Sequence, residues 1–142
     1  MQALALLTAV VALGSTVAIG IVIHELSHAA VLHSLGVPYD IEWFPDHRTT
    51  SYFATGVFGS WASVTPGQLP ASVPAWGLRL SAMAPLALLL PFVLVIVGTV
   101  PDPLESQSLW MTAVTIGWLA CALPSPQDFS VLFYADRFTN SR

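Results

Sequence analysis

Charge is scarce in this chain of 142 residues, and lysine is missing altogether. Charged residues make up 8% of the sequence and hydrophobic residues 55%, whereas a soluble domain usually carries about 25% charged residues. The four basic residues are all arginines and the net charge is −4, so no basic patch is available for nucleic acid. We therefore predict one integral-membrane domain over residues 1–142, surrounded by a lipid bilayer.

Cysteine is almost as scarce, since Cys121 stands alone. A single cysteine excludes a disulfide framework within the chain and a cysteine-based zinc site. A cleavable signal peptide is not expected either, because only Met1 and Gln2 precede the apolar run. That run, from Ala3 to Ile23, is longer than the apolar core of a signal and long enough to cross a bilayer.

The most informative stretch is His24-Glu25-Leu26-Ser27-His28, an H-E-x-x-H pattern at the end of this run. On a helix, His24 and His28 lie one turn apart on the same face and can bind one zinc ion, with Glu25 as general base. With the His and Glu content of this chain, chance would produce roughly 0.002 such matches. Hydrogen-bonded polar residues are the alternative, but burying them in apolar sequence is costly unless a partner is present.

Residues 3–35 contain no proline and predict one long helix that stops at Gly36. We expect its part over about residues 3–28 to form the first membrane span, with His24 and His28 near one boundary. His33 lies about 180° and 140° around the helix from these two histidines, so we interpret it as an exposed polar residue of the last turn.

Residues 37–75 predict a β-rich insertion at the membrane interface. Tyr39–Phe44 alternates like a strand, and the segment 49–64 is rich in Thr, Tyr, Phe and Val. We expect segment 49–64 to bind an extended peptide segment by strand pairing. The polar residues of the insertion are further potential metal ligands, although solvated loop positions are the more frequent role; they are Asp40, Glu42, Asp46 and His47.

Two more spans are expected, over residues 80–100 and 109–123. The second contains Pro85 and Pro91 and should be kinked. The fold class is therefore membrane α-helical, with three transmembrane helices and a small β-rich insertion between the first and second. All four arginines flank one side of this topology. The positive-inside rule therefore predicts a multi-pass cell-membrane protein with its N-terminus outside the cell. The C-terminus and the active-site side are then expected in the cytoplasm.

Asp128 is the best candidate for a third zinc ligand. It follows Pro124 and Pro126 at the inner end of the third span, where a helix must open and a carboxylate can turn inward. Carboxylates at the edge of a membrane are usually functional, although an ordinary aspartate at a helix end is the alternative. Ser125 and Cys121 have no nearby base in the sequence, so we interpret both as structural.

Taken together, the chain resembles the site-2 protease family of intramembrane zinc metalloproteases. Three segments match in order: His24–His28, then Ser81–Leu89 as the family's Ala-Gly-Pro segment, then Leu123–Asp128 as the segment that supplies the third ligand. Three positions depart from the family pattern. Cys121 stands near the family asparagine, Phe129 replaces a glycine, and Ala84 stands where glycine is usual.

The resemblance implies a zinc metallopeptidase that cleaves membrane-protein substrates, with one zinc held by His24, His28 and Asp128 and with Glu25 as the catalytic base. Regulation would come from a membrane partner or from homo-oligomerisation. The missing asparagine removes a possible substrate-binding donor. An inactive zinc-binding protein of the same fold, a structural membrane subunit and an anchored peptidase for soluble peptides therefore stay open as alternatives.

Overall fold

The computed structural model describes residues 1–43, 62–67, 70 and 73–140. The chain divides into two compact units, which are described separately. One comprises Met1–Gly20 and Leu86–Leu123, and the other comprises Ile21–Pro85 and Pro124–Arg142. Helix α1 (Gln2–Ser34) contributes its first part to one unit and its last part to the other.

In the first unit, the beginning of α1 packs against α4 (Leu109–Ala122). Glycines make the close approach possible. A Cβ atom added at Gly20 would lie only 2.6 Å from the Cys121 sulfur, and one added at Gly117 would lie 3.1 Å from a methyl carbon of Leu13. Small residues at such contacts are typical of helices that associate in lipid. Helix α3 (Leu90–Ile96) completes this unit, followed by a connecting segment that leads to α4.

In the second unit, α1 ends in a Schellman motif. Gly36 adopts a φ of 68°, and its N–H donates to the His33 carbonyl, while the Val37 N–H donates to the Leu32 carbonyl. Glycine suits this left-handed conformation because it has no Cβ atom. Val37 and Leu32 are both buried in the apolar core of the unit, so the predicted helix stop at Gly36 is confirmed.

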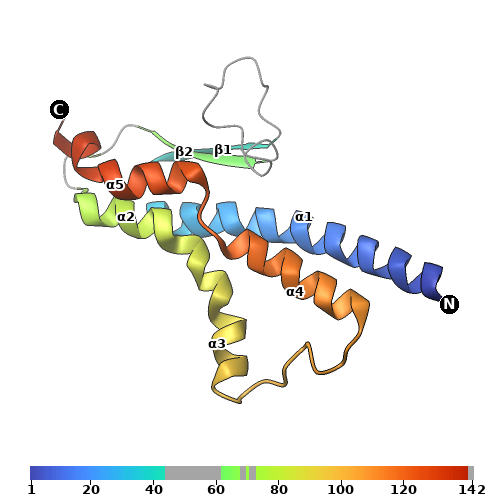
Figure 1. The fold of residues 1–142 in the computed structure, drawn as a ribbon. Coiled ribbons are helices and arrows are strands. Elements are labelled where there is room, and N and C mark those ends of the chain that lie inside the picture. Colours follow the sequence, from blue (N-terminus) through green and yellow to red (C-terminus); the bar gives the residue numbers. More distant parts are fainter. Residues whose placement is uncertain (44–61, 68–69, 71–72, 141–142) are drawn as a thin grey trace. The chain divides into compact units, whose positions relative to one another are not determined.

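The other described elements of this unit include a two-stranded sheet and two helices. Strands β1 (Tyr39–Trp43) and β2 (Ala62–Pro66) pair antiparallel, with Ile41 opposite Val64. Helix α5 (Pro126–Asn140) lies alongside α2 (Ala75–Met83) (Figure 1). Between these helices, the Arg79 side chain donates to the Leu132 carbonyl and to Asp136.

Within the described residues, three helices are long and apolar enough to cross a membrane, as the sequence predicts: Gln2–Ser34, Ala75–Ile96 and Leu109–Arg137. Large apolar side chains on them are exposed, as expected for surfaces that face lipid, among them Leu7, Ile96 and Ile116. The chain is therefore a mostly helical membrane protein with a small sheet.

The second span and the end of the chain differ in detail from the prediction. The second span begins at Ala75 rather than Leu80, because Gly77 and Leu78 are already buried in the helix that follows Pro74. It is also irregular, since a 3₁₀ helix (Ala84–Leu89) separates α2 from α3. Helix α4 matches the predicted third span, whereas α5 beyond it was not predicted as a helix, because the apolar stretch at residues 129–134 is short.

Candidate metal centre

Three potential ligands converge in the second unit. His24 and His28 project from the same face of α1, as their spacing predicts, and Asp128 reaches them from the first turn of α5. Their potential ligand atoms all lie within 4.8 Å of one another. The residues are only 8% (both histidines) and 9% (Asp128) exposed, so the cluster is shielded from bulk solvent.

The distances in this cluster fit a tetrahedral metal. Nε2 of His28 lies 3.2 Å from Nε2 of His24 and 3.2 Å from Oδ1 of Asp128, and Nε2 of His24 lies 3.6 Å from Oδ2 of Asp128. Ligands bound tetrahedrally at 2.0–2.2 Å from zinc lie about 3.3–3.6 Å apart. Two imidazole nitrogens and a carboxylate this close need positive charge between them, which either protons or a metal ion can supply.

Asp128 is oriented by the N-terminus of its own helix. The Ser125 N–H donates to Oδ2 of Asp128 at 2.6 Å, and the Asp128 N–H donates to the Ser125 hydroxyl at 3.2 Å. Serine at the N-cap, proline at the first helical position and an acid at the third form a capping box. This box ties down one carboxylate oxygen and leaves the other directed at His28.

His28 is oriented from the opposite side. Its Nδ1 atom lies 2.8 Å from the carbonyl oxygen of Ser81 in α2. A carbonyl can only accept a hydrogen bond, so Nδ1 must carry the proton, and a neutral imidazole then presents the lone pair of Nε2 to the cluster. Partners of this kind set the tautomer of metal-binding histidines.

Glu25 is held beside the cluster by the sheet. Its Oε2 atom accepts a hydrogen bond from the Val64 N–H in β2 at 3.0 Å. A partly buried carboxylate next to the potential ligands suits a general base.

Those other sequence candidates that the structure describes do not join this cluster. His33 is exposed, as predicted, and so are Asp40 and Glu42 on β1. Asp46 and His47 lie outside the described residues, as does most of segment 49–64, of which only residues 62–64 are described. Cys121 belongs to the first unit, where it is buried and its thiol donates to the Val17 carbonyl at 3.7 Å.

Sequence reasoning missed three supporting groups: Ser125, the Ser81 carbonyl and the Val64 N–H. The first carries a readable signal, because Ser125-Pro126-Gln127-Asp128 matches the spacing of a capping box. The other two are backbone groups that lie 53 and 39 residues away from their partners in sequence, and no local pattern identifies such contacts.

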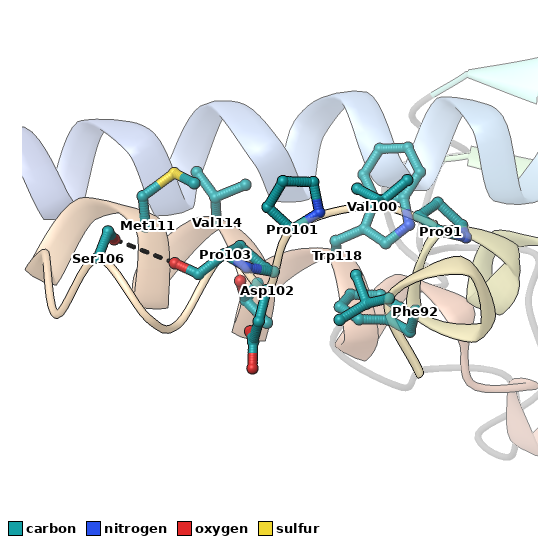
Figure 2. Close-up of a pocket in the computed structure, with 12 residues that line it drawn as sticks. Pro91, Phe92, Val100, Pro101, Asp102, Pro103, Ser106, Met111, Val114 and Trp118 are labelled. Carbon is teal, nitrogen blue, oxygen red and sulfur yellow. Dashed lines mark hydrogen bonds between the residues drawn. The ribbon is translucent and has the colours of Figure 1, made fainter. Parts of the chain in front are cut away.

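The first unit holds an apolar pocket of about 460 Å³. Figure 2 shows its walls, which come from α3, α4 and the segment between them. Its indole, Trp118, donates its only N–H to the Leu88 carbonyl at 2.8 Å, so the ring adds apolar surface to the wall. No residue of the metal cluster lines this pocket.

Comparison of the chain with protein-family models, with curated proteins and with solved structures gives no match. What can be said of its chemistry therefore comes from its own residues. They form a three-ligand cluster that fits a metal ion, with a carboxylate beside it and apolar helices that can cross a membrane.

Proposed function

We propose that this chain is a zinc-dependent peptidase of the membrane, similar to the site-2 proteases, which hydrolyses peptide bonds in or near the membrane-spanning segments of other proteins. One observation carries the proposal: His24, His28 and Asp128 converge at distances that suit tetrahedral zinc. Two histidines and a carboxylate, with Glu25 adjacent, are the donor set of catalytic zinc sites that leave one position for water.

Each protein group has a defined part in the reaction. Zinc at this site would supply the Lewis acid that lowers the pKa of water and polarises the scissile carbonyl. Glu25 takes a proton from the attacking water and gives it to the nitrogen of the leaving amine as the C–N bond breaks. Asp128 and His28 keep their orientation through their bonds to Ser125 and Ser81.

A substrate that arrives as a helix has its carbonyl groups engaged in its own hydrogen bonds, so it must unwind before it can react. We propose that the insertion between α1 and α2, of which β2 is a described strand, captures the extended segment by edge pairing. The positive-inside rule places this reaction on the cytoplasmic side of the cell membrane. A regulatory membrane partner or a second copy of the chain would control access.

The first test is the metal content of the full chain, purified in detergent, for wild type, Asp128→Ala and the control Asp102→Ala. Asp102 is an exposed aspartate in the segment between α3 and α4. We expect about one zinc per chain in wild type and in the control, and much less in Asp128→Ala. Absence of metal from the wild type after zinc is added back would exclude the peptidase and favour a structural membrane subunit.

The second test separates a peptidase from an inactive zinc-binding protein. The inactive protein is the alternative that the missing family asparagine near Cys121 favours. The chain is reconstituted with single-span peptides, either a continuous Leu-Ala helix or the same helix interrupted by Gly and Pro, and new peptide ends are identified by mass spectrometry.

The variant for this test is Glu25→Gln, which keeps an amide oxygen that can accept from the Val64 N–H. We expect wild type to cleave the interrupted helix and Glu25→Gln to bind zinc without cleaving. Zinc binding with no cleavage by wild type would support the inactive protein, and preferential cleavage of soluble peptides would support an anchored peptidase.

A further inference from the structure

We propose that Pro85 is a positioning residue for the metal ligand His28. Because proline has no backbone N–H, Pro85 leaves the Ser81 carbonyl available to the Nδ1–H of His28. This inference rests on the proposed metal site, since it assigns a role in ligand orientation to a proline that does not itself touch the metal ligands.

The starting point is the hydrogen-bond pattern at the end of α2. In a continuous α-helix the Ser81 carbonyl would accept from the N–H of residue 85. Residue 85 is proline, so this bond cannot form, and its ring would also clash with the carbonyl four residues before it. The Ser81 carbonyl accepts instead from the Ala84 N–H and from Nδ1 of His28 at 2.8 Å.

The local helix geometry agrees with this explanation. Helix α2 ends at Met83, and the chain continues as a 3₁₀ helix from Ala84 to Leu89. Pro85 is fully buried, with less than 2% of its surface exposed. The carbonyl that it leaves without an α-helical partner belongs to the buried residue Ser81.

The consequence is a preferred tautomer of His28. The carbonyl holds the proton on Nδ1, so Nε2 of the neutral ring faces Asp128 and His24 with its lone pair. If residue 85 carried an N–H, that group would compete for the same carbonyl. His28 would then lose the bond that holds its ring, and the Nε2–H tautomer, which cannot bind metal through Nε2, would become populated.

The Ser81 side chain has a lesser part in this arrangement. Its hydroxyl lies 3.5 Å from the His28 carbonyl, which is long for a hydrogen bond between oxygens. The orienting group is the backbone carbonyl, which every residue possesses. Ser81→Ala is therefore a matched control that removes the hydroxyl and keeps the proposed contact.

The test separates the missing N–H from the proline ring. Pro85→Ala restores an N–H. A second variant carries lactic acid at position 85, incorporated as an α-hydroxy acid, so that an ester oxygen replaces the N–H while the side chain remains the methyl group of alanine. Zinc affinity of the full chain in detergent is measured by competition with a chelator. Pro91→Ala restores an N–H six residues further along the same helical stretch and serves with Ser81→Ala as a control.

We expect Pro85→Ala to weaken zinc binding about 10–100-fold, the range for groups that orient metal ligands. The ester variant and both controls should stay within about threefold of wild type. A second readout is the ¹⁵N NMR signal of His28 in metal-free protein, assigned with His28→Gln. It should report the Nδ1–H tautomer in wild type and in the ester variant, and a mixture of tautomers in Pro85→Ala.

Two results would overturn the proposal. One is an equal loss of affinity in the alanine and ester variants, because the ring rather than the absent N–H would then be responsible. The other is a His28 tautomer that is the same in Pro85→Ala as in wild type. If wild type binds no zinc, the proposed function fails, and the tautomer measurement still decides whether Pro85 orients His28.

Discussion

Ser125 and Asp128 hold each other at the start of α5, where each backbone N–H donates to the side chain of the other residue. The Ser125 N–H binds Oδ2 of Asp128, and Oδ1 of the same carboxylate lies 3.2 Å from Nε2 of His28. A helix cap and a potential metal ligand therefore share one side chain. Stability of α5 and affinity for metal should consequently depend on the same pair.

Ser125→Ala tests this dependence, because it removes the hydroxyl that accepts from the Asp128 N–H. We expect the free energy of unfolding to fall by about 1 kcal/mol, as for the loss of other N-cap side chains. Zinc affinity should fall about tenfold, since the helix start that positions Asp128 loses one of its two cap bonds, while the bond from the Ser125 backbone N–H to the carboxylate remains. Ser125→Thr keeps a hydroxyl and should restore both quantities.

The matched control for this serine is Ser130→Ala in the same helix. The Ser130 hydroxyl is exposed and donates only to the Pro126 carbonyl within its own helix. Its loss should leave zinc affinity unchanged and unfolding within about 0.5 kcal/mol of wild type. A similar drop in zinc affinity for both serine variants would show that the cap does not orient Asp128.

Among the histidines of α1, we expect a clear division. His24→Ala and His28→Ala should each abolish stoichiometric zinc binding, since each removes one of three ligands. His33→Ala should bind zinc like wild type, because His33 is exposed on the last turn of α1 and lies outside the cluster. Metal analysis after dialysis gives the result directly, and zinc loss in His33→Ala would require a different ligand set.

Removal of the metal should lower stability. A ligand that binds only the folded state raises the free energy of unfolding, and the gain grows with the logarithm of the free ligand concentration divided by the dissociation constant. When the concentration is one hundred times the dissociation constant, the gain is about 2.7 kcal/mol. We expect a chelator to lower the melting temperature of wild type and zinc to restore it. Asp128→Ala should show no such response, and an equal response in that variant would place the stabilising ion elsewhere.

In the first unit, the contact between Gly20 and Cys121 predicts a strong size limit. A Cβ atom at Gly20 would come within 2.6 Å of the Cys121 sulfur and 2.8 Å of its Cβ atom, whereas one at Gly14 would meet nothing within 4 Å. Gly20→Ala should therefore cost about 1–3 kcal/mol in free energy of unfolding, as overpacking does. Gly14→Ala should be neutral or slightly stabilising.

Denaturation of these variants in mixed detergent micelles gives both values. The double variant Gly20→Ala with Cys121→Gly removes the obstructing side chain and should recover much of the lost stability, apart from the cost of a glycine within α4. No recovery in the double variant would mean that the cost arises from a contact other than this one.

Arg79 provides the last prediction. Its side chain donates to the Leu132 carbonyl at 3.1 Å and pairs with Asp136, and these two side chains are 39% and 59% exposed. An exposed ion pair contributes little, about 0–1 kcal/mol. We therefore expect Asp136→Asn to have a small effect on thermal unfolding. Arg79→Met should cost more, because it also removes the bond to the Leu132 carbonyl, and the reverse order would contradict this assignment.

The sequence alone determined the features that depend on one local element. The apolar runs gave the three spans, the spacing of His24 and His28 put both on one helix face, and Gly36 ended the first helix because only glycine adopts its left-handed backbone without strain. Asp128 could be predicted as well, since a carboxylate after two prolines at a span end is a costly combination without a function.

Only the tertiary structure decided how these residues are supported. The supporting contacts join segments that lie far apart in the sequence. The Val64 N–H donates to Glu25, His28 donates to the Ser81 carbonyl, and Asp128 reaches the histidines from α5. Such contacts follow from packing, which depends on the whole chain and leaves no periodic signal in any one segment. Pro85 illustrates the difference. The sequence predicts a kink at this proline. Only the fold shows that the Ser81 carbonyl, which loses its α-helical bond there, accepts a hydrogen bond from His28.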